Sequence, residues 1–567
     1  MSVAEIIRKG LVRSLDTVGI KVVAENVSLE RPKELSHGDY ATGAALQYAK
    51  QIGMPPIKLA EKIVAGLGTL DGVKSVEVVK PGFINFRLTP DAINAVLQEV
   101  ISNEKAWGKN KSQKGSRVMV EYTDPNPFKE FHIGHLMSNA IGESISRLVQ
   151  YSGAEVKRAN YQGDVGPHVA KAIWSIQKNG WDAHDAKVLG KAYAEGAKAY
   201  ESDTNVKSEI DALNSKIYDR SDKEINAIYD AGREASLKHF EEIYKTLGTK
   251  FDFYFFEGET APKGMEIVRA NKDVFPESDG AIVFKGERHG LHTRVFITSR
   301  GLPTYEAKEL GLLEMKAEKW PFDESVTITA NEQNEYFQVV KAALGEVLPE
   351  LASKVKHVSH GMMRLTSGKM SSRTGVVITG ESLIEELKER ATARAKVSRS
   401  DNPAQLAEQI AISAIKYQIL RQASGRDIIF DRERALSLEG DSGPYLQYAH
   451  ARAKQVVERA HAEGIKPKLD IKAWPNDLSA GALAQADVSR LVTRFPEVVL
   501  YAANELEPHL LVNYLIGLAG AFNSWYAQVH ILDGTKEAPH KVAIVDAVRA
   551  TLKNGLWLLG ISAPEKM

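Results

Sequence analysis

The 567-residue chain contains no cysteine. This absence excludes disulfides, thiol catalysis and every zinc site that needs thiolate ligands, so we expect no protein-bound zinc and no other protein-held metal. The chain also lacks an apolar run long enough to cross a bilayer, and its 73 basic residues balance 73 acidic ones. We therefore expect a cytoplasmic protein without a membrane partner, on which any nucleic-acid-binding surface is a local patch.

The length is too great for one hydrophobic core and predicts three or four domains. Residues 1–110 have the pattern of a small α+β domain. A helix at 57–67 follows two prolines, and strands at 73–80 and 83–89 flank a Pro-Gly turn. From 103 to 116 the composition shifts to Lys, Gly, Asn and Ser, which indicates a domain boundary.

Residues 117–380 predict an α/β domain with a Rossmann-like parallel sheet. A buried strand at 117–123 precedes an amphipathic helix at 136–153 and a second strand at 155–162, the order that opens such a sheet. An Ala-, Lys- and Glu-rich stretch at about 168–248 then indicates a helical insertion. The sheet resumes with strand patterns at 251–259, 326–330 and 356–361.

After about residue 381 we find no further strand pattern. Helical periodicity continues to the end of the chain, and it predicts a helical connector at 381–440 followed by an all-α bundle at 441–567.

The stretch PNPFKEFHIGHLMSN, residues 125–139, lies where the first strand of the sheet gives way to a helix. Parallel sheets bind ligands at this edge, and a helix start offers free N–H groups and a positive dipole end. Gly134 would let a ligand approach the backbone, while His132 and His135, both donors when protonated, could bond a phosphate. Alone, this motif is weak, because solvated loop histidines are common.

A second polar loop, 360–375, follows the last strand of the sheet. Its Lys369, Ser371, Ser372 and Arg373 could hold a pyrophosphate with cations and hydroxyls. By itself it could be an ordinary surface loop. Because both loops follow strands of one sheet, a shared nucleotide site explains them better than two unrelated surface loops.

H-I-G-H followed by K-M-S-S-R resembles the paired motifs of the class I aminoacyl-tRNA synthetases. The resemblance implies ATP, carrying its own Mg²⁺, bound between the motifs and attacked at the α-phosphorus by an amino-acid carboxylate. The class usually has a second lysine where this chain has Ser372, and Lys129 is placed to supply the missing cation. The implied ATP-binding residues are His132, Gly134, His135, Lys369, Met370, Ser371 and Ser372.

The longer motif PNPFKEFHIGH resembles the arginyl-tRNA synthetases, in which a lysine ahead of the histidines replaces the loop lysine. Matching segments extend from 37–50 and 81–88 through 160–168 to 443–452 and 558–567. The resemblance implies ATP-dependent activation of L-arginine and its transfer to the 3′ end of tRNA(Arg), with release of AMP and pyrophosphate. The implied catalytic residues are Lys129, His132, His135 and Lys369.

The guanidinium of arginine is planar and permanently charged, so its pocket needs carboxylates. Tyr305 and Glu309 lie four residues apart, on one face of a predicted helix, where the family has a tyrosine and an acid that is commonly Asp. Glu121, at the end of the first strand, is another candidate carboxylate. Either acid could instead face solvent, and the amides below could be turn or cap residues. The resemblance adds Asn85, Asn126 and Gln333 to the arginine-binding residues.

The C-terminal helices are expected to bind the anticodon, and the N-terminal domain resembles one that contacts the tRNA elbow. Aromatic side chains can stack on splayed bases, which makes Tyr445 and Trp525 candidates for tRNA contact. Tyr526 is a further aromatic residue in these helices. Helical spacing makes core packing the commoner role, above all for Tyr448 and Trp525. We expect the protein to act as a monomer.

Two other classes of function remain open at this point. A nucleotidyltransferase with a small acceptor shares H-x-G-H chemistry, but it would not need the long helical domain. A non-catalytic tRNA-binding relative would not need His132, His135 and Lys369 intact. The cysteinyl enzymes are excluded, because they select their substrate with a thiolate-bearing zinc.

Overall fold

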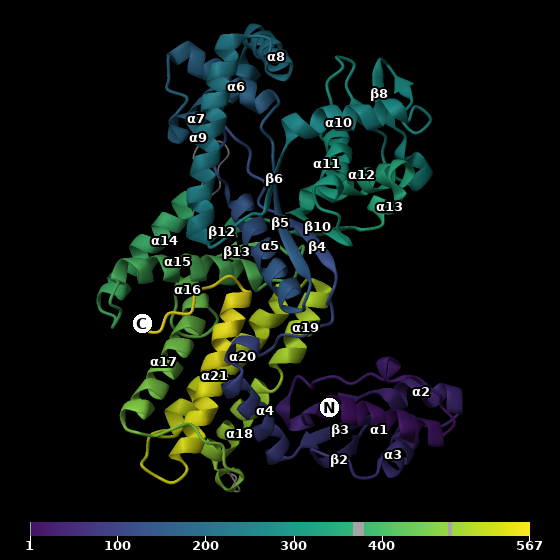
Figure 1. Cartoon of the computed structure of the whole chain (residues 1–567), viewed down its shortest axis with the longest axis vertical. Helices are drawn as coiled ribbons and strands as arrows, with labels where there is room; N and C mark the ends of the chain where they lie inside the picture. The colour runs from purple at the N-terminus through teal and green to yellow at the C-terminus, as the bar shows by residue number, and fades with distance from the viewer. Residues whose placement is uncertain (1, 367–378, 475–478) are drawn as a thin grey trace.

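The computed structural model describes residues 2–366, 379–474 and 479–567. Figure 1 shows a central sheet with a helical insertion at one end, a long helical bundle at the other, and the N-terminal domain beside the bundle. Four of the expected ATP-binding residues lie outside the described residues, namely Lys369, Met370, Ser371 and Ser372.

The N-terminal domain confirms the predicted α+β pattern. The expected helix is α3, Pro56–Leu67, and the expected strands are β2, Val73–Val79, and β3, Phe83–Leu88. They belong to an antiparallel sheet of order β1-β3-β2. Helices cover this sheet and bury its apolar side. The remaining elements are α1 (Val3–Thr17), β1 (Tyr40–Thr42), α2 (Ala44–Ile52) and α4 (Pro90–Ser102).

The central sheet is fully parallel, with the order β11-β10-β4-β5-β6. Its order reverses between β4 and β10, because the chain builds β4, β5 and β6 outward in one direction and β10 and β11 in the other. Ligands of such sheets bind where the order reverses, at the carboxyl ends of the strands. The strands are β4 (Arg117–Glu121), β5 (Glu155–Gln162), β6 (Phe253–Phe256), β10 (Glu324–Ala330) and β11 (Val355–His360).

The insertion consists of helices that pack around a hydrophobic core of their own. Phe128, from the loop after β4, is fully buried in that core with its ring 6.3 Å from the ring of Tyr229. The insertion therefore holds the loop that leads to the paired histidines. Its helices are α6 (Pro167–Asn179), α7 (Ala186–Ser202), α8 (Thr204–Asp219) and α9 (Lys223–Leu247).

Two small sheets were not predicted from the sequence. The expectation of no strand after residue 381 is wrong, because Ile428–Phe430 forms β13 and pairs in parallel with Met363–Leu365, β12. A three-residue strand carries too little pattern to be recognised, and its partner is distant in sequence. Three further strands form an antiparallel sheet between α10 (Glu257–Ala270) and α11 (Tyr305–Lys319): β7 (Glu277–Ser278), β8 (Ala281–Phe284) and β9 (Arg294–Ile297).

The C-terminal part is helical from residue 443 onward among the residues that the structure describes, as expected. The N-terminal domain docks on it through charged contacts: Arg31 donates to Glu497 at 2.7 Å, and Arg490 donates to the buried Asp39 at 2.6 Å. The longer helices, including those before residue 443, are α12 (Asn334–Val347), α14 (Gly380–Lys396), α15 (Pro403–Leu420), α17 (Gly443–Ala462), α18 (Ala480–Val492), α19 (Phe495–Glu505), α20 (Pro508–Gln528) and α21 (Ala538–Leu558).

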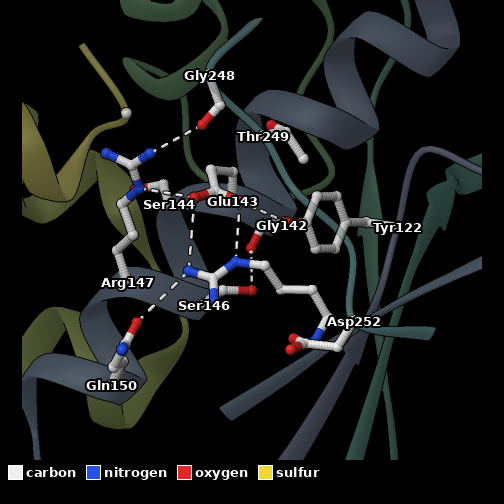
Figure 2. A network of polar contacts seen from close by, with 12 residues as sticks. Tyr122, Gly142, Glu143, Ser144, Ser146, Arg147, Gln150, Gly248, Thr249 and Asp252 are labelled. Atoms are coloured by element: carbon white, nitrogen blue, oxygen red, sulfur yellow. Dashed lines mark hydrogen bonds and ion pairs between the residues drawn. The ribbon is translucent and has the colours of Figure 1, made fainter. Parts of the chain in front are cut away.

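A polar network on α5, Ile133–Tyr151, joins the central sheet to the last helix of the chain (Figure 2). The buried Glu143 carboxylate accepts from the Tyr122 hydroxyl, from Arg147 at 2.7 Å and from Arg158 at 3.1 Å. Arg147 also donates to the backbone carbonyl of Trp557 at 2.7 Å. The helix is thus tied both to the sheet and to the last helix of the chain.

Candidate active site

The loop between β4 and α5 begins with an unusual backbone turn. Thr123 and Asp124 have φ values of 81° and 47°, and Phe128 has 67°. Non-glycine residues rarely adopt this region, so the surrounding contacts must hold the turn. One such contact is the backbone N–H of Phe128, which donates to the hydroxyl of Ser236 on α9 at 3.0 Å.

The two histidines stack on each other at the start of α5, with their ring centroids 3.5 Å apart. The backbone N–H of His132 donates to Nδ1 of His135 at 3.2 Å. This bond requires an unprotonated Nδ1, so His135 presents Nε2–H as a donor. Burial lowers the pKa of His132 to about 4 and that of His135 well below its usual value. Both rings are therefore neutral near pH 7, so each offers one N–H donor instead of the two of a protonated ring.

Gly134 and Lys129 complete this side of the site. A Cβ at Gly134 would lie 2.9 Å from Cε1 of His132, so the glycine makes room for the stacked rings. The Nζ of Lys129 lies 5.0 Å above the ring of Tyr193. Burial lowers its pKa, and its charge in turn lowers the pKa of both histidines. The structure therefore brings Lys129 together with the histidine pair.

The chain that follows the undescribed segment returns to the same place. Thr379 forms a β-bridge with His132, and the N–H of Gly380 donates to the carbonyl of Phe131 at 2.7 Å. The described chain from Thr379 onward thus starts in contact with the segment of the histidine pair.

Carboxylates gather around α11 on the other side of the site. Glu121 is 2% exposed and forms an ion pair with Lys316 at 2.5 Å. Glu257 forms a second buried pair with Lys308 at 2.6 Å. Glu121 is therefore neither solvent-exposed nor a free carboxylate, because its charge is shared with an internal lysine.

Glu309 and Asp124 differ from these paired acids. Burial, and next the charge of Glu121, raise the pKa of Glu309 to about 8 and raise that of Asp124 well above its usual value. Asp124 accepts the backbone N–H of Tyr161 at 2.7 Å. The sequence analysis did not single out Asp124, although its place between Glu121 and Asn126, directly after the strand, could have suggested it.

The other expected arginine-binding residues fall into two groups. Tyr305, Asn126 and Gln333 lie on segments around the reversal of strand order: the start of α11, the loop after β4 and the short turn after β10. A Cβ at Gly163 would lie 2.1 Å from Oδ1 of Asn126, so this loop packs closely against the end of β5. The structure does not bring Asn85 there, because it lies on β3 of the N-terminal sheet, beside the helical bundle (Figure 1).

The expected tRNA contacts also divide. Trp525 is fully buried, which agrees with the core role favoured for it and corrects its candidacy for tRNA contact, whereas Tyr445 is half-buried. Tyr448, for which core packing was favoured, lines a groove of about 1180 Å³ together with Arg452 and Tyr526. The guanidinium of Arg452 lies 4.7 Å and 5.0 Å from the two tyrosine rings. Sequence reasoning missed Arg452, although its spacing of four from Tyr448 was a signal.

In the described ranges we find no group of three or more His, Asp and Glu side chains placed to hold a metal ion. No described helix is both long and apolar enough to cross a membrane.

Comparison with known proteins identifies the family. Residues 96–432 match the model of the class I (R) tRNA synthetase catalytic domain, residues 3–88 that of the arginyl tRNA synthetase N-terminal domain, and residues 446–567 that of the DALR anticodon binding domain. The arginine–tRNA ligase of Streptococcus mutans is 31% identical over 95% of both chains, and that of Lactococcus lactis subsp. cremoris 30% over the full length of both. The arginyl-tRNA synthetase of Thermus thermophilus superposes with a TM-score of 0.81 at 25% identity, covering 99% of this chain and 100% of that one. The chain belongs to the arginyl-tRNA synthetases, a family of class I aminoacyl-tRNA synthetases.

Proposed function

We propose that the chain activates L-arginine with ATP where the strand order reverses and then transfers the arginyl group to the 3′ end of tRNA(Arg). The observation that carries the proposal is the meeting of two kinds of group at one edge of the sheet. Neutral histidine N–H donors and Lys129 suit the phosphates, and the carboxylates around α11 suit a guanidinium.

In the first step a carboxylate oxygen of arginine attacks the α-phosphorus of ATP, and the bond to pyrophosphate breaks. His132 and His135 donate N–H bonds to phosphate oxygens on which charge grows. Their stacked arrangement is set before ATP binds, so little reorganisation is needed in the transition state. Neutral rings hold the phosphate without giving up a proton, which fits a reaction whose leaving group departs as an anion.

Lys129 and Lys369 neutralise the departing pyrophosphate, and Mg²⁺ arrives bound to ATP. Phosphate charge next to Lys129 favours its protonated form and thus opposes the effect of burial. The proposed ATP-binding residues are His132, Gly134 and His135 of the H-I-G-H motif, together with Lys369, Met370, Ser371 and Ser372 of the K-M-S-S-R motif.

We assign the arginine side chain to the carboxylates around α11. Glu309 supplies a carboxylate, and Tyr305, one helical turn before it, contacts the same side chain. Asn126 and Gln333 hold the polar groups of the substrate backbone. Glu121 supports this site through its ion pair with Lys316. The anticodon loop is assigned to the groove of Tyr448, Arg452 and Tyr526, with Tyr445 nearby on α17, and we expect the enzyme to act as a monomer.

Exchange of pyrophosphate into ATP with arginine, measured with and without tRNA(Arg), tests this proposal. Exchange in either condition supports the assignment, and exchange only with tRNA would add that tRNA completes the site. If tRNA binds but no exchange occurs in either condition, the chain is a non-catalytic relative and the catalytic roles are wrong.

A further inference from the structure

Helix α9 of the insertion contacts two segments next to the histidine pair: the loop that precedes it and the chain that bridges to it. Spacings of four, seven and eight residues from Gly232 place Ser236, His239 and Phe240 on one face of this helix. The backbone N–H of Phe128, in the preceding loop, donates to the Ser236 hydroxyl at 3.0 Å. A Cβ at Gly232 would clash with the Phe128 ring, so α9 packs closely against this loop.

The same face of α9 reaches the chain that bridges to His132. The ring of Phe240 lies 6.4 Å from the ring of Phe131, whose carbonyl accepts the N–H of Gly380 at 2.7 Å. Thr379, the residue before this glycine, forms the β-bridge with His132. A Cβ at Gly380 would lie 2.9 Å from Cδ1 of Phe131, so only a residue without a side chain fits this close. The bridging chain therefore lies directly against the backbone that carries His132.

A histidine–glutamate pair holds the bridging chain to α9. Nε2 of His239 and Oε2 of Glu381, the residue after Gly380, are 3.0 Å apart. Their side chains are 27% and 38% exposed, so the pair is partly shielded from water. The hydrogen bond to Glu381 raises the pKa of His239 above its usual value, which favours the charged imidazolium. The carboxylate also lies in the first turn of α14, where the helix dipole favours a negative charge.

We propose that the ion pair of His239 with Glu381 positions His132 for the attack on ATP. It is a positioning pair, because it acts on the substrate only through the backbone segment that bridges to His132. The proposal rests on the proposed function, because it assigns positioning residues to the same site. A displaced His132 ring would lose more of its bonding to phosphate oxygens in the transition state, where their charge grows, than in the ground state.

Other charged groups around the pair belong to the insertion and to the loop after β4. After the bond to Glu381 and the opposing effect of burial, Glu242 on α9 raises the pKa of His239 and Lys187 on α7 lowers it. Burial, and next the charge of Glu381, raise the pKa of Glu130 in the loop. The pair is therefore fully charged below the raised pKa of His239, and it loses its positive partner as the pH rises through that pKa.

The chain offers a matched control for the loss of such a pair. His289 and Glu346 form the same kind of pair, with Nε2 and Oε1 2.7 Å apart and side chains 38% and 29% exposed. They join the short turn at residues 286–289 to the C-terminal end of α12. His289→Ala therefore removes an equivalent pair without changing the contacts of the segment that bridges to His132.

The test is arginine-dependent exchange of pyrophosphate into ATP by the full-length chain and its variants, with tRNA(Arg) present and ATP varied. His239→Ala should lower kcat about tenfold or more while the KM for ATP changes less, since a small displacement of a catalytic group costs up to about 10²-fold in rate. His289→Ala should keep both parameters. His239→Gln, which retains an N–H donor without the charge, should recover part of kcat.

The pH dependence of the same reaction distinguishes an ion pair from a neutral hydrogen bond. The ratio of kcat in the unmodified chain to kcat in His239→Gln should be highest at low pH. It should fall towards one as the pH rises through the pKa of His239, because a neutral imidazole, like glutamine, offers the carboxylate a donor without a charge.

The outcomes separate the two proposals. A folded His239→Ala with unchanged kcat, an equal loss of kcat in His289→Ala, or a ratio that is constant with pH would overturn the role of the pair while the proposed function stands. No exchange by the unmodified chain, with or without tRNA, would contradict the proposed function and the positioning role with it. Circular dichroism shows whether each variant has folded. If His239→Ala has not, Glu381→Gln, which removes only the carboxylate charge, provides the same test and should lower kcat.

Discussion

The turn shared by His132 and His135 sets the protonation state of the two rings and the tautomer of His135. Burial lowers the pKa of both stacked rings and keeps them neutral, and the bond from the His132 N–H to Nδ1 of His135 selects the Nε2–H tautomer of His135. A single turn of chain thus supplies both N–H donors. The residue that adds charge on this side is Lys129, whose charge lowers the pKa of both histidines.

Lys129→Ala should lower kcat about 10²–10³-fold and leave the dissociation constant for arginine nearly unchanged. The reason is that a group facing the leaving pyrophosphate stabilises charge present only in the transition state. Steady-state aminoacylation gives kcat, and titration gives the arginine affinity. Lys207→Ala, which removes an exposed lysine that lies over Tyr200, is the control and should keep its kcat. An unchanged kcat in Lys129→Ala would sink the idea that it replaces the missing loop lysine.

The affinity for arginine should depend on pH through Glu309. Burial, and next the charge of Glu121, raise its pKa to about 8, so its carboxyl holds a proton below that pH. The incoming guanidinium favours the charged form, so binding releases this proton and weakens as pH falls below about 8. The limit is tenfold per pH unit. Titrations between pH 6 and 9 measure the slope, and Glu309→Gln should reduce it.

Equal affinities for arginine at pH 6.5 and pH 8.5 would contradict the assignment of Glu309. Other groups that influence it are Glu121, Lys316, Glu257 and Glu306. The three glutamates form ion pairs with Lys316, Lys308 and Arg294 respectively.

At the scale of elements, α5 connects the candidate active-site histidines to the rest of the fold. Its first turn carries His135, next to His132, and its middle carries Glu143, which accepts bonds from Tyr122 just after β4, from Arg158 on β5 and from Arg147 on α5 itself (Figure 2). Arg147 extends the network to the carbonyls of Gly248 and Trp557, at the end of the insertion and in the last helix. Helical spacing predicted α5, but not that a buried carboxylate would anchor it.

Glu143→Gln should destabilise the protein by about 3–5 kcal/mol, because it leaves Arg147 and Arg158 without their buried counter-charge. Urea unfolding, followed at the first transition, measures the loss. Glu463→Gln removes the acid of an exposed pair with Arg459 and should cost less than about 1 kcal/mol. Equal midpoints for the two variants would show that the network contributes little to stability.

At the scale of the whole molecule, the proposed anticodon groove and the active site lie on different domains. The groove is on α17 and α20 of the bundle, and the active site is at the carboxyl ends of the sheet strands (Figure 1). Binding of tRNA and binding of arginine can therefore be altered separately by substitution.

Tyr526→Ala should raise the KM for tRNA about 5- to 100-fold, because stacking contributes about 1–3 kcal/mol per base. The dissociation constant for arginine should not change. Tyr501→Ala is the control, since this tyrosine is 66% exposed on α19 and does not line the groove. Aminoacylation at varied tRNA concentration measures the effect, and an equal KM for both variants would contradict the placement of the anticodon loop.

The sequence by itself determined the α/β core, the helical insertion and the helical C-terminal part, because each rests on local periodicity over many residues. It also placed the histidine pair and Lys129, whose signal is a short contiguous motif. Only the tertiary structure decided which distant residues meet. An ion pair with Lys316 distinguishes Glu121 from Glu309. Packing of the helices buries Trp525 but leaves part of Tyr526 exposed. Asn85 lies on the sheet of the N-terminal domain, away from the other candidates. These properties depend on neighbours far away in the sequence, so no local pattern carries them.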